Sequence, residues 1–300
     1  MKNKSFPFSR MNFFIWLAFL AACLSNQLQF HADLLLRQFL TFGFMTCGLS
    51  LEMLTGDLDL SFAAQISAST FIMAYLLERW PFWAALGAML IFNLLIGAVK
   101  GFLLAQFEIP SIILTFALQV ILSNAFLWLS DSKNIILDYR MEGYDPLFLI
   151  GTSGAFLLAV LLLKGLLDRT YWGKYCRMIG ENRDIVRESG VRYVQAEIAI
   201  HVFASLFFTA AAGILVFLTM SGSSGTGSNF LFRVIAAACV GGVDFRTGKG
   251  KITGMLVGTL SIIMLVQLLT CFGLLNSLEA ICEGIIILFS IVSNGKKEKI

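Results

Sequence analysis

The stretch Leu54–Ser61, "LTGDLDLS", decides the fold class. It sets a glycine and two carboxylates, Asp57 and Asp59, between two long apolar runs, "FGFMTCGLSLEM" before it and "FAAQISASTFIMAYLL" after it. Backbone that leaves a helix at membrane depth has N–H and C=O groups that lipid cannot satisfy. Such a break survives only inside protein or along a wet cavity. We therefore predict that residues 55–61 interrupt a membrane helix.

The composition of the whole chain indicates a polytopic membrane protein. Of its 300 residues, 58% are hydrophobic and only 14% are charged, and the mean hydropathy is +0.82. A soluble domain carries about 25% charged residues. The net charge of +3 and the absence of basic runs interleaved with aromatics argue against nucleic-acid binding. Six scattered cysteines without a CxxC pair are expected to be reduced core residues.

Ten apolar segments reach, or nearly reach, the about 20 residues that cross the hydrocarbon. They are 11–25, 34–53, 62–78, 83–104, 109–130, 147–168, 197–220, 230–243, 252–274 and 277–293. We expect an all-α polytopic membrane protein with about ten transmembrane helices, forming a single transmembrane domain over residues 1–300. Broken or re-entrant segments are expected near 55–61 and 241–250. The segment 221–229, "SGSSGTGSN", is expected to be a flexible loop.

The first span has an alternative. The sequence "LAAC" at Leu20–Cys23 follows a basic start and an apolar run, as in a bacterial lipoprotein cleavage site. We favour a retained helix, because many spans follow and the basic first ten residues suit an inside-facing terminus.

Lys and Arg set the expected orientation. Four segments, namely the first ten residues, 169–196, 244–251 and the last five residues, hold 15 of the 22 basic residues. Basic residues favour the cytoplasmic side of a membrane. Ten crossings with both termini cytoplasmic place all four segments on that side.

The second interrupted segment suggests an internal repeat of the first. The short span 230–243 runs into "GGVDFRTGKGK", Gly241 to Lys251. Overlaying the two segments pairs Gly56 with Gly241, Leu58 with Val243 and Asp59 with Asp244. Asp59 is also expected to cap the helix that follows Ser61.

Small residues at fourfold spacing predict close helix packing in lipid. Gly250, Gly254 and Gly258 form such a stripe, and Gly97 with Gly101 forms another. Lys100, between the last two, is expected to snorkel to the inner surface.

Spacing along the chain yields no catalytic or metal-binding constellation. His31 and His201 are isolated, and "RTGKGK" lacks the spacing of a phosphate-binding loop. We expect no enzyme activity, no metal and no cofactor in this chain.

The longest polar segment, 169–196, contains residues that typically begin and end a short helix. Asn182 can cap it, Asp184 suits its first turn and Gly190 ends it. Composition alone favours two interpretations of this segment equally: a docking surface for a soluble partner, and a solvated connector.

Taken in order, these motifs resemble the permease subunits of carbohydrate-type ATP-binding-cassette (ABC) importers, which include ribose, xylose, arabinose and galactoside permeases. Four blocks carry the resemblance: "TGDLDLS" (Thr55–Ser61), "GAVKGFLLAQFEIPSIILTFA" (Gly97–Ala117), "MIGENRDIVRESGV" (Met178–Val191) and "GGVDFRTGKGKITGMLVGT" (Gly241–Thr259).

The resemblance implies a permease of the bacterial plasma membrane that moves a small polar solute, in the first place a monosaccharide, into the cytoplasm. It also implies several partners: a second permease chain, an extracytoplasmic solute-binding protein, and cytoplasmic ATPase subunits that hold the ATP and Mg²⁺. The segment 169–196, the coupling segment from here on, is then expected to dock on the ATPase. The residues implied for this coupling are Gly180, Glu181, Asn182, Arg183, Asp184, Arg187, Ser189 and Gly190. The residues implied for the translocation pathway and its broken helices are Gly56, Asp57, Asp59, Ser61, Pro110, Thr115, Gly241 and Gly242.

Departures from the family pattern leave alternatives open. Asp57 and Glu181 replace glycines, Lys100 replaces an asparagine, and Asp244 and Arg246 disturb the fourth block. A permease for nucleosides or branched-chain amino acids is one alternative. Another is an ion-coupled secondary transporter that uses Glu52, Asp57 and Asp59 as a relay. The solute, the homo- or heterodimeric state, and any contact of Asp57 and Lys100 with solute or with each other stay open at this point.

Overall fold

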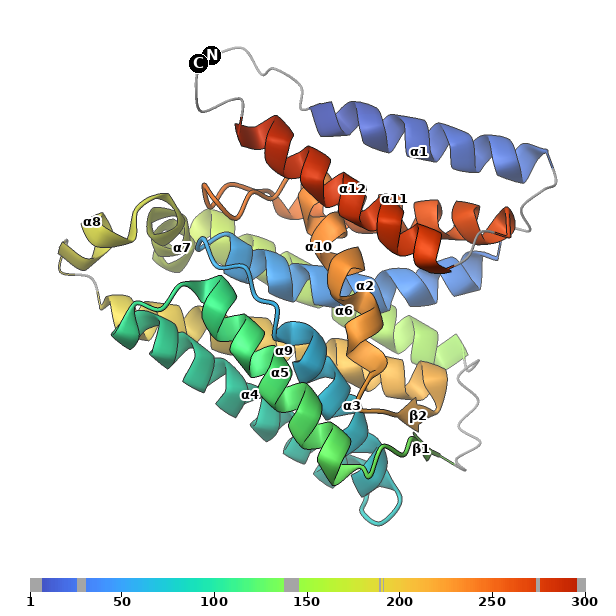
Figure 1. Cartoon of the computed structure of the whole chain (residues 1–300), viewed down its shortest axis with the longest axis horizontal. Helices are drawn as coiled ribbons and strands as arrows, with labels where there is room; N and C mark the ends of the chain where they lie inside the picture. Colours follow the sequence, from blue (N-terminus) through green and yellow to red (C-terminus); the bar gives the residue numbers. More distant parts are fainter. Residues whose placement is uncertain are drawn as a thin grey trace.

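The computed structural model describes residues 7–25, 31–137, 146–188, 190, 192–273 and 276–295. Within them the chain forms twelve α-helices, one 3-10 helix and two very short strands (Figure 1). The elements are α1 (Pro7–Leu24), α2 (Ala32–Met53), α3 (Phe62–Leu77), α4 (Phe82–Phe107), α5 (Ser111–Leu129), β1 (Ile135–Ile136), α6 (Pro146–Arg169), α7 (Tyr171–Glu181), α8 (Arg183–Glu188), α9 (Tyr193–Thr219), β2 (Ser221–Gly222), η1 (Thr226–Phe230), α10 (Leu231–Val240), α11 (Ile252–Cys271) and α12 (Asn276–Gly295).

Six of the described helices are long and apolar enough to span a membrane: α2, α4, α5, α6, α9 and α11. Shorter apolar helices cover 11–24, 62–77 and 226–240, and α12 is not among the six. The chain is therefore a mostly helical, multi-pass membrane protein, as expected. The expected number of about ten spans is not reached by helices of full spanning length.

The long helix α9 lies at the centre of the packing, against α2 on one side and α4 on the other. Figure 1 shows α1, α11 and α12 together along one side of the molecule and α4 and α5 along the other, with α2 between them. The helix α9 packs along both α2 and α4. A Cβ added to Gly97 would lie 2.7 Å from the His201 carbonyl oxygen, and one on Gly101 would lie 2.7 Å from Ile198 Cα. The small stripe on α4 therefore lets the two backbones approach closely.

The first break has a defined turn. At the end of α2 the Gly56 N–H donates to the Met53 carbonyl and the Asp57 N–H donates to the Glu52 carbonyl, both at 3.1 Å. This is the Schellman pattern, which requires a left-handed residue, and Gly56 has φ +86°. Residues 57–59 lie outside any helix, and a bend at Leu60 and a turn at Ser61 lead into α3, which begins at Phe62.

The second break repeats this turn, one residue out of the expected register. The Gly242 N–H donates to Cys239 and the Val243 N–H donates to Ala238, and Gly242 has φ +79°. The structural equivalent of Gly56 is therefore Gly242 and not Gly241. The sequence overlay was wrong by one position, because a pair of glycines does not show which of them adopts positive φ.

The segment 221–229 is not the open loop that its composition suggested. Ser221 and Gly222 pair as an antiparallel strand with Ile136 and Ile135. The 3-10 turn that follows lies against α3, where the Gly227 N–H donates to Ser67 Oγ at 2.7 Å. Backbone hydrogen bonds and close packing thus order a segment rich in Gly and Ser.

The apolar run at the start of the chain forms α1, which packs against α11. The Trp16 indole N–H donates to Ser261 Oγ at 2.9 Å. This bond gives the first helix a polar anchor on a helix much later in the chain.

Candidate functional site

Seven charged or titratable side chains meet around the first break. We call them the charge network: Glu52, Asp57, Asp59, Lys100, Arg183, Glu197 and His201. Six of these side chains are fully buried, and only Arg183, at 29% exposure, reaches the surface. Charges withdrawn from water and lipid in this way persist only when they compensate one another.

Lys100 holds two carboxylates of the network. Its Nζ lies 2.5 Å from Asp59 Oδ2 and 2.7 Å from Glu52 Oε1. The expectation that Lys100 snorkels to the surface is therefore wrong. Its ammonium group is fully buried, because two carboxylates in the interior compensate its charge. The partners of Lys100 are Glu52 and Asp59, whereas Asp57 pairs with Arg183.

The other oxygen of Asp59 serves the start of α3. Asp59 Oδ1 accepts hydrogen bonds from the Ser61 N–H at 2.7 Å and from Ser61 Oγ at 2.6 Å. A carboxylate at this place satisfies an amide that the helix itself leaves free and favours the positive end of the helix dipole. Asp59 thus joins the turn at Ser61, directly before α3, to the ion pair with Lys100.

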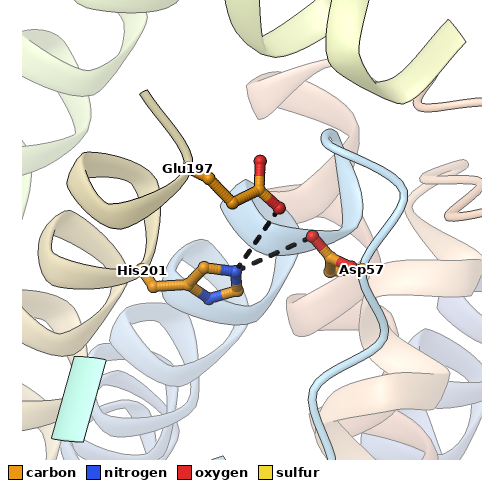
Figure 2. A group of neighbouring side chains, drawn as sticks. All are labelled: Asp57, Glu197 and His201. Atoms are coloured by element: carbon orange, nitrogen blue, oxygen red, sulfur yellow. Dashed lines mark ion pairs between the residues drawn. The ribbon is translucent and has the colours of Figure 1, made fainter. Parts of the chain in front are cut away.

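His201 lies between carboxylates from three segments. Its Nδ1 is 2.8 Å from Glu52 Oε1. Its Nε2 is 3.7 Å from Asp57 Oδ2 and 3.9 Å from Glu197 Oε1, and Figure 2 shows this edge of the ring turned toward both carboxylates. Glu197 and His201 stand four residues apart on α9, which places them on one helix face. The expectation that His201 is isolated is therefore wrong.

Arg183 closes the network from the coupling segment. Its Nη2 lies 2.5 Å from Asp57 Oδ1 and 3.5 Å from Glu197 Oε1, and it donates to the Thr55 carbonyl oxygen at 3.2 Å. Burial alone would lower the pKa of Arg183, but the charges of Asp57 and Glu197 outweigh it and raise the pKa above its usual value. The guanidinium group stays positively charged.

One group in the network has the spacing of a metal site. Ligand atoms of Asp57, Glu197 and His201 all lie within 4.8 Å of one another. However, Arg183 already places a positive charge beside Asp57 and beside the same Glu197 oxygen that faces His201. We therefore interpret the group as an ion-pair junction built around a guanidinium ion.

The extended segment after Gly56 alternates in burial. Asp57 and Asp59 are fully buried, whereas Gly56, Leu58 and Leu60 are partly exposed. Successive side chains of an extended chain point to opposite sides. The two carboxylates therefore face the protein interior, and the two leucines pack at the edge of the apolar core, so the acids do not line an open passage in this conformation.

The helix α5 satisfies the backbone of this segment. Thr115 Oγ1 accepts from the Leu60 N–H at 3.1 Å and lies 3.2 Å from the Leu58 carbonyl oxygen. Gln119 Oε1 accepts from the Ala64 N–H at 2.9 Å in the first turn of α3. These bonds meet the requirement that a break at membrane depth be satisfied by protein. Pro110, also named from the sequence, directly precedes α5.

The second break is held by close backbone contact. A Cβ on Gly241 would lie 2.5 Å from the Gly254 carbonyl oxygen, and one on Gly258 would lie 2.7 Å from Gly241 Cα. Gly250 lies in the loop before α11, near Leu54 and Val243. The glycine stripe therefore seats α11 against the end of α10.

The coupling segment presents an outer and an inner face. Glu181, Asn182 and Asp184 are exposed, and Asn182 Oδ1 accepts from the Asp184 N–H at 3.0 Å. Arg187 pairs with Glu108 beyond the end of α4 at 2.5 Å. Gly190 has φ +77°, and Ser189 lies outside the described residues.

A pocket of about 360 Å³ opens where the coupling segment meets both breaks. Its lining comes from the first break, the coupling segment and the loop before α11. These residues are Thr55, Gly56, Ile179, Gly180, Glu181, Asn182, Arg183, Phe245 and Arg246. The structure thus brings Gly56 and the central coupling residues together.

Sequence reasoning missed Glu197 and His201, and it named Glu52 only as part of an ion relay. The available signal was titratable residues inside or at the ends of apolar runs, which as a rule face the bundle interior and pair with one another. Spacing could not supply the pairs, because Lys100 lies 41 residues from Asp59 and His201 lies 149 residues from Glu52.

Comparison with known proteins gives consistent matches. A family model described as "Branched-chain amino acid transport system / permease component" matches residues 32–291. The L-arabinose transport system permease protein of Escherichia coli (strain K12) is 28% identical over 262 residues, covering 86% of this chain and 80% of that protein.

Two other sugar permeases are similar. The fructose import permease protein of Rhizobium meliloti is 29% identical over 77% of this chain and 68% of its own length. The ribose import permease protein of Bacillus subtilis (strain 168) is 26% identical over 88% of this chain and 84% of its own length.

One solved structure shares the fold. It is described as an inward-facing conformation of a metal-chelate type ABC transporter, and it matches with a TM-score of 0.50 and 15% identity. The match covers 95% of this chain and 98% of that one. At this identity the likeness concerns the fold alone.

Proposed function

The chain belongs to the family described as the permease component of branched-chain amino acid transport systems, and on that premise we propose that it is the permease subunit of an ABC importer. We propose further that its solute is a monosaccharide, moved into the cytoplasm by alternating access. The observation that carries this proposal is the alignment of arabinose, fructose and ribose permeases with 77–88% of the chain.

The geometry supports a transporter rather than a membrane scaffold. Two helices break with the same turn, and protein groups satisfy the first break. Discontinuous helices of this kind form solute pathways in many transporters. In this proposal, the whole chain is a single permease domain of the bacterial plasma membrane, with both termini cytoplasmic.

The partners in this proposal are a second permease chain, identical or different, an extracytoplasmic solute-binding protein and two ATPase subunits. The ATPases bind ATP and Mg²⁺, and this chain performs no hydrolysis. The exposed polar face of the coupling segment, with Glu181, Asn182 and Asp184, supports docking of an ATPase there.

Two other functions have support of their own. The family description favours a branched-chain amino acid as the solute, and nucleosides are a related case. The buried carboxylates Glu52, Asp57 and Asp59 favour an ion-coupled transporter. Against the latter, Lys100 and Arg183 already pair with all three carboxylates.

Uptake into proteoliposomes tests the proposal. The chain is reconstituted with candidate ATPase and solute-binding subunits from the same organism, and labelled arabinose, ribose, fructose, leucine and adenosine are offered with and without ATP. We expect ATP-dependent uptake of one of the sugars. Uptake of leucine or adenosine alone contradicts the solute class. Uptake without the ATPase, abolished by a protonophore, contradicts the importer.

A further inference from the structure

Arg183 turns away from the surface on which it stands. It is the first residue of α8, and its neighbours Asn182, Asp184 and Ile185 are exposed. Its own side chain is only 29% exposed. The coupling segment thus keeps one charged side chain pointing into the molecule while its other polar groups face outward.

The guanidinium group of Arg183 reaches three places at once. It lies 2.5 Å from Asp57 beyond the Gly56 turn, 3.2 Å from the Thr55 carbonyl at the end of α2, and 3.5 Å from Glu197 at the start of α9. Carbonyls at a helix C-terminus lack partners within the helix and favour a positive charge. One side chain therefore joins α8 to the first break and to α9.

The contacts continue inward from Arg183 to the start of α3. Asp57 faces His201, which bonds to Glu52 at 2.8 Å. Glu52 shares Lys100 with Asp59, and Asp59 accepts from the Ser61 N–H. Every member of this series beyond Arg183 is fully buried. A change in the position of Arg183 therefore reaches charges that have no solvent to compensate them.

A backbone contact secures the same segment to the second break. A Cβ on Gly180 would collide with the Leu54 carbonyl oxygen and would lie 2.8 Å from Gly248 Cα. The end of α7 is thus wedged between the turns that follow α2 and α10. Gly180 allows close backbone packing, and Arg183 adds an ion pair with Asp57.

We propose that Arg183 is a positioning residue that ties the coupling segment to the break between α2 and α3, so that α8 and residues 54–61 move as one body. In the importer proposed above, on which its transport consequence rests, this tie passes a displacement of the ATPase to the broken helix. Arg183 faces inward, so its part in coupling is to hold the break and not to contact the ATPase.

Three variants separate this role from plain stabilisation. Arg183→Gln removes the tie but leaves the buried Asp57 carboxylate without its guanidinium partner. The double variant Arg183→Gln with Asp57→Asn removes the tie and that charge together. The matched control is Arg177→Gln on α7, because Arg177 pairs at 2.8 Å with Asp168 and both side chains are 50% exposed.

The first readout is solute taken up per ATP hydrolysed, measured with thermal stability in proteoliposomes that hold the ATPase. We expect Arg183→Gln to lower this ratio about tenfold and to lower the melting temperature. The double variant recovers the melting temperature but not the ratio, and Arg177→Gln leaves both unchanged. Wild-type coupling in the double variant overturns the proposal, because only the charge of Asp57 would then have mattered.

The second readout does not depend on transport. Hydrogen exchange of the full chain alone in lipid nanodiscs is compared among the same variants. We expect the double variant to raise exchange in residues 54–61 and in α8 together, while Arg177→Gln does not. Unchanged exchange in 54–61 overturns the tie. If the wild-type protein shows no ATP-dependent uptake, the importer function fails, and this exchange result alone decides the tie.

Discussion

At the residue scale, each of the two cations Lys100 and Arg183 lies between two carboxylates of the network. Lys100 lies between Glu52 and Asp59, and Arg183 lies between Asp57 and Glu197. Removing one member of a buried ion pair costs more than the intact pair contributes, because the remaining charge has neither water nor a partner. The network therefore makes the polar interior sensitive to loss of any single charge.

Replacing Lys100 with Met tests this sensitivity. The substitution leaves Glu52 and Asp59 buried without their ammonium partner, and we expect it to lower stability by about 3–5 kcal/mol. Thermal unfolding in detergent measures the loss. Lys164→Met, at an exposed lysine on α6, is the control and should change little. Equal melting temperatures for the two variants would show that the buried lysine is not needed by its carboxylates.

Some contacts of the charge network could be predicted from the sequence, and others could not. The bond from Asp59 to the start of α3 was predictable, because both partners stand within two residues of each other. The ion pair of Lys100 was not, because apolar runs of similar composition surround each possible partner. The inward direction of Asp57 and Asp59 follows from alternation along an extended segment, but which face is inward depends on Lys100 and Arg183.

At the element scale, glycine contacts and repeated turns define the packing. The breaks themselves were predictable, since acids and glycines between apolar runs mark interrupted helices. The register of the repeat was not, because backbone φ decides it. The order of residues 221–229 also depended on tertiary contacts, through pairing with β1 and the bond to Ser67.

Two glycines on α4 give a matched test of the contact with α9. A Cβ on Gly97 meets the His201 carbonyl oxygen at 2.7 Å, whereas a Cβ on Gly87 meets nothing within 4 Å. Gly97→Ala should therefore lose about 1–3 kcal/mol through overpacking. Gly87→Ala should be neutral or gain up to about 1 kcal/mol, because alanine favours a helix. Chemical unfolding in mixed micelles measures both, and a neutral Gly97→Ala would contradict the close approach of α4 and α9.

At the scale of the whole molecule, two of the four basic segments, 169–196 and 244–251, meet at one end. Figure 1 shows α7 and α8 at one end and the strands β1 and β2 at the other. Gly180 lies against Gly248, so the basic segments 169–196 and 244–251 meet. The distribution of Lys and Arg predicted a common side for these two segments from sequence alone.

Labelling with a membrane-impermeant maleimide tests the orientation. In a cysteine-free background without the proposed ATPase, Ile185→Cys on the exposed face of α8 should react only from the cytoplasmic side. Ser132→Cys, exposed just before β1, should react only from the outside. The opposite pattern would invert the assigned topology, and reaction of both from one side would contradict the arrangement in Figure 1.

The contact among Leu54, Gly180 and Gly248 also bears on the order in which the protein is made. Ribosomes deliver the chain from its N-terminus, so the seat for the end of α7 is incomplete until Gly248 has emerged. A polypeptide that stops before Gly248 therefore lacks part of the support for the end of α7. The support of the end of α7 thus depends on two loops that lie almost 200 residues apart in the sequence, and it forms only after both have been made.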